Sequence, residues 1–290
     1  MMNPIVDYPS LKHAADMSSG KAQRNFLYLN AALLAILTLT ALISGWTPVC
    51  RETQRIIAIV VAVLMFATLA ITTMLRVGKF DDRWFRCRAM AENIKSAVWF
   101  FVMSPPSLVA SSEEDYLKNI GDLQKRLDLV AKEVALHDEG GSLVTTWMKD
   151  TQKLPLDQKL MIYRKDRVED QLVWYFTKSR FNAAREKKWF LAIFFIEFFA
   201  IAYAALQAWQ LWEFNLVGGM AAMGAGFIAW MQTKRFSDLG VSYSIAANDL
   251  RRIDAERKNV TTEEETRLFV NEIETAVSRE HSIWLARRID

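Results

Sequence analysis

The sequence predicts an all-α membrane protein with four transmembrane helices, arranged as two parallel-repeat hairpins with a cytoplasmic helical bundle continuous with the spans. Three observations lead to this prediction: the sorting of charge along the chain, a repeat in its two halves, and heptad spacing between the apolar stretches. The average composition conceals the sorting, because 290 residues that are 52% hydrophobic and 24% charged, with a net charge of +3, would also suit a soluble protein.

Four apolar stretches are almost free of charge, and Glu197 is the one Asp, Glu, Lys or Arg among them. About 20 apolar residues in a helix cross the hydrocarbon core of a bilayer, which is ~30 Å thick. We therefore predict transmembrane spans at 27–46, 56–75, 189–209 and 214–233. This pattern excludes a soluble enzyme, a secreted protein and a membrane β-barrel.

The basic residues predict the orientation of the spans. Of the 36 Lys and Arg residues, only Arg51 and Arg55 lie in the two short hairpin loops, 47–55 and 210–213. Cytoplasmic loops of membrane proteins are enriched in Lys and Arg. We therefore expect a multi-pass plasma-membrane protein with both termini in the cytoplasm, with the lipid bilayer as a partner and no ligand-binding domain outside.

The two halves of the chain are related at an offset of 156 residues. Lys79–Asp82 follows the second span, and Arg235–Asp238 follows the fourth. Core positions beyond these also correspond: Phe80, Cys87, Met90, Ile94 and Ala97 match Phe236, Tyr243, Ala246, Leu250 and Ile253. We predict two units, 1–150 and 151–290, each a hairpin whose second helix runs into the cytoplasm without a break. Parallel repeats differ from the inverted repeats of many transporters.

Further helices are predicted between and after the hairpins. Ser111 with Glu114 and Thr262 with Glu265 have the spacing of capping boxes, which begin helices. Their apolar residues follow heptad spacing, which suits either packing within one chain or contacts between subunits. The predicted bundle or oligomer contacts are Trp174, Tyr175, Tyr243, Leu250 and Trp284.

No motif for catalysis, nucleotide phosphates or metal is present. The three His residues are scattered, and Cys50 and Cys87 are predicted on opposite sides of the membrane, which excludes a disulfide framework. A net charge of +3 also argues against a nucleic-acid-binding protein. We therefore expect no enzyme, no catalytic residue, no metal and no cofactor.

Glu197 is the main candidate for function inside the membrane. A buried carboxylate there is costly unless it is paired, hydrated or protonated. It either lines a cation pathway, with Asn30 and Gln207 as further polar candidates, or is a hydrogen-bonded packing residue.

The fourth span has a face of small residues: Gly218, Gly219, Ala222, Gly224 and Gly226. Small residues permit close helix approach in membranes. Helix packing is the first interpretation of this face, and a gating hinge is the alternative.

The sequence resembles the SLATT superfamily, the SMODS- and SLOG-associating two-transmembrane effector domains, in tandem copies. Arg167, Gln171, Trp174-Tyr175 and Asn182 resemble the helix before the family's hairpin, and 280–284 resembles its closing helix. The first half is a weaker copy, because its segment before the span lacks the Trp-Tyr pair. The resemblance implies a bacterial inner-membrane effector of conflict or antiviral defence. Its trigger would be a cytoplasmic sensor protein or a nucleotide signal.

The function that we predict is an oligomeric, ion-conducting pore or channel that is opened from the cytoplasm. Four spans with one carboxylate cannot easily enclose a pathway, but several copies around an axis can. The alternatives are a cation channel with a housekeeping role and a non-conducting scaffold that presents a helical bundle to cytoplasmic partners.

Overall fold

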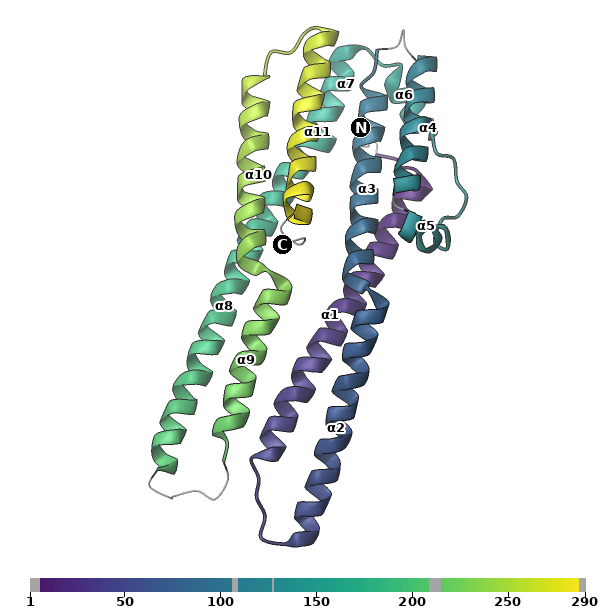
Figure 1. The fold of residues 1–290 in the computed structure, drawn as a ribbon. Helices are drawn as coiled ribbons and strands as arrows, with labels where there is room; N and C mark the ends of the chain where they lie inside the picture. The colour runs from purple at the N-terminus through teal and green to yellow at the C-terminus, as the bar shows by residue number, and fades with distance from the viewer. Residues whose placement is uncertain (1–5, 106–108, 127, 209–214, 287–290) are drawn as a thin grey trace. The chain divides into compact units, whose positions relative to one another are not determined.

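The described residues of the computed structural model, 6–105, 109–126, 128–208 and 215–286, form helices joined by short turns and contain no β-strand (Figure 1). The prediction of an all-α fold is confirmed for this part of the chain. In chain order the helices are α1 (Ser10–Ser44), α2 (Arg51–Gly78), α3 (Phe80–Val102), α4 (Val109–Arg126), α5 (Asp128–Ala135), α6 (Thr146–Gln152), α7 (Leu156–Tyr163), the π-helix η2 (Arg164–Glu169), α8 (Asp170–Gln207), α9 (Val217–Lys234), α10 (Phe236–Glu256) and α11 (Glu263–Ala286).

Two compact units divide the chain, and each draws on both halves of the sequence. The first, here called the bundle unit, comprises Met1–Ala22, Asp81–Arg180 and Gly240–Asp290. The second, here called the hairpin unit, comprises Gln23–Phe80 and Phe181–Leu239. The sequence repeat and the compact units therefore divide the chain differently, since both repeats contribute segments to both units.

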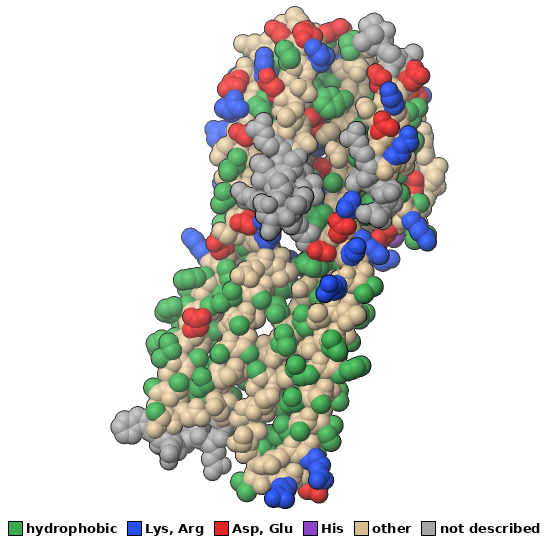
Figure 2. All heavy atoms as spheres, viewed as in Figure 1, with side chains coloured by type: hydrophobic (Ala, Val, Ile, Leu, Met, Phe, Trp, Pro, Cys, Tyr) green, Lys and Arg blue, Asp and Glu red, His purple; other side chains and the backbone are tan. Residues whose placement is uncertain are grey.

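Three helical stretches of the described residues are long and apolar enough to cross a membrane: Ser10–Ser44, Arg51–Val102 and Leu156–Gln207. At most 6% of the most apolar window of each is buried within the chain. Figure 2 shows hydrophobic side chains over the visible face of these helices. Surfaces of this kind need lipid or other protein chains around them.

The predicted fourth span corresponds to α9, which has 18 residues. It is not among the three stretches, because several glycines, Gln232 and Lys234 lower its mean hydropathy. The predicted loop 210–213 and the first residue of that span, Phe214, lie outside the described residues. The fourth span therefore stays a prediction.

The helices after α2 and α9 do not continue without a break, so this part of the prediction is wrong. Lys79 ends α2 with φ 44° and ψ 40°, and Arg235 ends α9 with φ 51° and ψ 42°. A single residue in the left-handed region ends the regular helical conformation and redirects the chain. The next helices then begin at Phe80 and Phe236.

The bundle unit has a hydrophobic core from α3, α10, α11 and the N-terminal part of α8. Met90, Ile94, Leu250, Phe269 and Ile273 are at most 1% exposed. Residues of the predicted heptads therefore pack within one chain. Contacts between subunits stay a prediction.

One of the two predicted capping boxes is confirmed. The backbone N–H of Glu265 donates to Thr262 Oγ1 over 3.2 Å, and the N–H of Thr262 donates to Glu265 Oε2 over 3.1 Å, at the start of α11. The other prediction is wrong, because α4 already begins at Val109 and contains Ser111 in its first turn. Only the backbone of Ser111 belongs to the described residues, and its side chain lies outside them.

Candidate functional site

Glu197 lies on the exposed surface of α8, in the hairpin unit. Its neighbours on the same surface are apolar and more than half exposed: Phe194, Phe198 and Ile201. The carboxylate therefore faces outward among aromatic and aliphatic side chains. A single chain surrounded by lipid would present this charge to hydrocarbon, which is costly.

The other polar candidates are separate from Glu197. Asn30 Nδ2 donates to the backbone oxygen of Phe26, 2.8 Å away on the same helix, α1. Gln207 is half-buried at the last position of α8. Among the interactions of the described residues, no hydrogen bond joins two of these three side chains.

Threonine hydroxyl groups in the spans donate hydrogen bonds within their own helices. Each donates to a backbone oxygen three or four residues earlier, and each donor–acceptor distance is between 2.7 and 2.9 Å: Thr38, Thr40, Thr68, Thr72, Thr73 and Thr233. Within the four predicted spans, Glu197 is the one charged side chain.

The small residues of α9 differ in their surroundings. A Cβ added at Gly219 would overlap the side chain of Leu42 and come within 3.1 Å of its Cα. A Cβ at Gly226 would lie 3.5 Å from Thr38 Oγ1, so α9 runs antiparallel to α1 along this contact. Gly224 faces α8, where a Cβ would lie 3.6 Å from Ile196 Cγ2.

The remaining two small residues make no such contact. A Cβ at Gly218 would meet nothing within 4 Å. Ala222 is half-buried. The face of small residues is therefore used for close approach at three of its positions.

The predicted bundle contacts form an aromatic cluster within one chain. Ring centroids of Trp174 and Tyr243 are 5.1 Å apart, and those of Tyr175 and Tyr243 are 5.8 Å apart, which joins the start of α8 to α10. Leu250, about two turns beyond Tyr243 on α10, is completely buried. The backbone of Trp284 belongs to α11, but its side chain lies outside the described residues.

A buried ion pair in the bundle unit was not predicted. Arg167 Nε and Nη2 donate to the two carboxylate oxygens of Glu274 over 2.9 and 2.6 Å, and these side chains are only 3% and 2% exposed. The hydroxyl groups of Tyr163 and Ser96 also donate to Glu274, over 3.0 and 2.6 Å. The sequence could have indicated a buried carboxylate here, because Glu274 lies between the apolar residues Ile273 and Val277 of α11.

Electrostatics around this pair favour a charged arginine and neutral tyrosines. Burial alone would lower the pKa of Arg167, but the adjacent Glu274 carboxylate outweighs burial and raises it. Burial, reinforced by Glu274, raises the pKa of Tyr163 well above its ordinary value. Burial also raises the pKa of Tyr8 to about 12, although Arg167 opposes the shift. The hydroxyl of Tyr8 accepts a 3.0 Å hydrogen bond from Trp99 Nε1.

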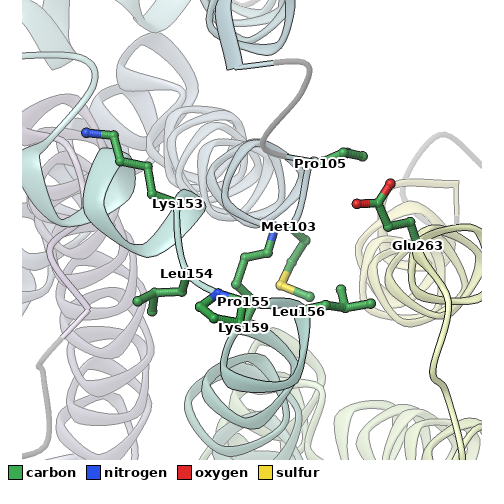
Figure 3. A pocket seen from close by; sticks show the side chains of 8 residues that line it. All are labelled: Met103, Pro105, Lys153, Leu154, Pro155, Leu156, Lys159 and Glu263. Carbon is green, nitrogen blue, oxygen red and sulfur yellow. The ribbon is translucent and has the colours of Figure 1, made fainter.

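A small cavity of about 220 Å³ lies beside Lys159 in the bundle unit (Figure 3). Lys159 is 1% exposed, and its Nζ donates to the backbone oxygen of Ser104, 2.8 Å away, just beyond α3. A cation at that place stabilises the C-terminal carbonyls of the helix. Burial lowers the pKa of Lys159, while Glu263 opposes the shift. We interpret this lysine as a structural cap of α3.

Among the described residues, no group of three or more His, Cys, Asp or Glu side chains is placed to hold a metal ion. The exposed apolar helices and the charged bundle define the class of the protein, a helical protein associated with membranes.

The comparison with protein families identifies the chain more closely. Residues 9–160 match SMODS and SLOG-associating 2TM effector domain 3, and residues 163–284 match SMODS and SLOG-associating 2TM effector domain 1. The chain thus belongs to the SLATT superfamily and carries two of its domains in tandem. No curated protein and no solved structure was found to match the chain.

Proposed function

We propose that this chain assembles with copies of itself into an ion-conducting pore in the bacterial inner membrane, opened from the cytoplasm. The observation that carries the proposal is the outward-facing carboxylate of Glu197 on an otherwise apolar surface of α8. A closed ring of subunits would remove this charge from lipid and place it beside water.

The low burial of the candidate spans supports assembly. None of the most apolar window of Leu156–Gln207 is buried within the chain, and Phe190, Phe195 and Phe199 are each more than half exposed. Aromatic surfaces of this size are suited to helix–helix contact as well as to lipid. We propose that the exposed faces of α8 and its copies meet around the pathway.

The effector role is proposed from the family, whose domains are described as effectors associated with SMODS and SLOG proteins. We propose that the chain acts in bacterial conflict or antiviral defence and permeabilises the membrane when triggered. The trigger would be a cytoplasmic sensor protein or a nucleotide signal. The basic residues beside the spans favour cytoplasmic termini.

Imaging and conductance together test the proposal. We expect purified protein in nanodiscs to form symmetric rings and to give currents in planar bilayers. The variant Glu197→Gln should lower cation selectivity several-fold, whereas the control Glu186→Gln makes the same change outside the predicted span and should leave selectivity unchanged. A monomer with silent bilayers would exclude the pore and favour the scaffold.

Expression in cells separates the effector from a housekeeping channel. Triggered effector activity should collapse the membrane potential and stop growth, and Glu197→Gln should weaken this effect. Conductance in bilayers without any loss of membrane potential under a trigger would favour the housekeeping role.

A further inference from the structure

The π-helix η2 interrupts a continuous helical stretch that leads into the third candidate span. It occupies Arg164–Glu169, directly between α7 and α8, and α8 then continues without interruption to Gln207. A π-helix bonds each residue to the fifth one along, so its turn holds one residue more than an α-helical turn. Such segments are rare, and they frequently occur at functional sites.

Two arginines hold η2 against the bundle unit. Arg164, its first residue, pairs with Asp254 of α10, and its guanidinium lies 4.6 Å from the ring centroid of Phe269. Arg167 makes the buried pair with Glu274 of α11. Side-chain contacts of the first and fourth residues of η2 therefore keep the segment in a conformation that its backbone alone would not favour.

A cavity of about 730 Å³ borders η2. It is lined by Lys165, Asp166, Arg167 and Glu169 of the π-helix, and by Tyr8 and Lys95 from elsewhere in the bundle unit. Side chains of η2 that border this cavity, Arg167 included, therefore have space beside them into which they can move.

A change of η2 to α-helix would rotate the helix that follows. With the number of residues unchanged, one residue would leave the wide turn, and α8 would turn by about 100° about its own axis relative to α7. Because α8 is one helix from Asp170 to Gln207, the rotation would change the direction of Glu197.

We propose that η2 is a conformational switch, in which the Arg167–Glu274 pair holds the resting π-helical form and its release rotates α8. The inference rests on the proposed function in one respect: if Glu197 lines a pore, its rotation would open the pathway. The switch itself is a property of the bundle unit and is measurable without any current.

Cysteine labelling in nanodiscs tests the rotation, in a background with Cys50→Ser and Cys87→Ala. Val173→Cys and Thr177→Cys report on the exposed side of α8, and Met161→Cys on α7 is the matched control before the switch. Replacing both partners, as Arg167→Met with Glu274→Met, removes the pair without leaving a buried charge. The rotation would carry position 173 to the place of the half-buried Trp174, so labelling at 173 should fall severalfold relative to 177, whose new place, that of Lys178, is exposed. Labelling at 161 should stay unchanged.

Deletion of Lys165 supplies the decisive second variant. It removes the additional residue of the wide turn, so α7 and α8 should keep their resting orientation and the wild-type labelling pattern. Combined with the Met pair, the deletion should suppress the labelling change. If the Met pair does not fold, Tyr163→Phe with Ser96→Ala weakens the hold on Glu274 and should give a smaller change in the same direction.

The outcomes separate the switch from the pore. Wild-type labelling in the folded Met pair, or a change that the deletion does not suppress, would overturn the switch. A suppressible change in labelling with silent bilayers would leave the switch standing and remove the pore. Currents that respond to a trigger without any change in labelling would overturn the switch and leave the pore standing.

Discussion

Lys79 and Arg235 are 156 residues apart and share the same left-handed backbone conformation, with φ 44° and 51°. They are the only residues other than glycine with positive φ in the described part of the chain. The offset equals that of the sequence repeat, so the repeat extends to the backbone conformation of single residues. Glycine is the usual residue at such helix ends, because a side chain there costs roughly 1–2 kcal/mol.

This strain predicts that Lys79→Gly stabilises the protein relative to Lys79→Ala. Both variants remove the charge, but only glycine removes the Cβ that opposes positive φ. We expect a difference of about 1 kcal/mol, visible as a higher thermal unfolding temperature of the glycine variant in detergent. Equal unfolding temperatures would show that Lys79 is not held in this conformation.

The buried pair predicts strong non-additivity. Glu274→Met or Arg167→Met alone leaves a buried charge without its partner, and each should destabilise the protein by about 3–5 kcal/mol. The double replacement Arg167→Met with Glu274→Met should recover most of this loss, since a well-packed apolar pair of similar volume is often neutral. Chemical denaturation of the four members of this cycle measures the coupling, and additive losses would contradict a buried ion pair.

The two cysteines should differ in reactivity. Backbone N–H groups of Thr53 and Glu52 at the start of α2 lower the pKa of Cys50, so its thiolate fraction should be substantial at lower pH than for an ordinary thiol. Burial raises the pKa of Cys87 to about 12, so this thiol should stay unreactive until pH approaches that value or the protein unfolds.

A membrane-impermeant maleimide measures the side of the membrane on which Cys50 lies and the pH dependence of its reaction in one experiment. Cys50 should react from outside intact cells, as the predicted orientation requires, and its rate should level off at a lower pH than that of a free thiol. Cys50→Ser removes the signal as a control. Labelling of Cys50 only after the cells are opened would reverse the predicted topology.

Neighbouring glycines of α9 should respond in opposite ways to alanine. A methyl group at Gly219 overlaps Leu42 of α1, so Gly219→Ala should destabilise the hairpin unit by roughly 1–3 kcal/mol. Gly218 faces open space, and Gly218→Ala should be neutral or stabilise α9 by about 1 kcal/mol through helix propensity. Thermal unfolding in nanodiscs compares the two variants, and an equal effect would exclude the close contact of α9 with α1.

Features that depend on periodicity or on local hydrogen bonding were predictable from the sequence. Three apolar stretches appear as helices of sufficient length, and the Thr262–Glu265 capping box appears at the start of α11. Both signals are contained within a few turns of one helix. The position of Glu197 on α8 was predictable for the same reason, but its exposure was not. It depends on how α8 packs against α9, where Glu197 Cγ would lie 4.0 Å from a Cβ at Gly224.

Features that depend on contacts between distant segments were not predictable. The π-helical turn at Arg164–Glu169 has no pattern of its own in the sequence, because arginine contacts to α10 and α11 hold it. The helix ends at Lys79 and Arg235 were also missed, since lysine and arginine seldom adopt positive φ. The repeat contained the information, but only as a correspondence between two positions.

The contact between the two hairpin loops gives the hairpin unit a pivot. Asn215 N–H donates to the backbone oxygen of Gly45 over 3.2 Å, and there is no room at Gly45 for a Cβ beside the carbonyl of Asn215. Leu42 against Gly219 continues this contact one turn further. The two hairpins are thus in contact near their loops. If α1 and α9 separate while this contact is kept, the displacement is greatest at the opposite ends of the two helices, which carry Arg24 and Lys234.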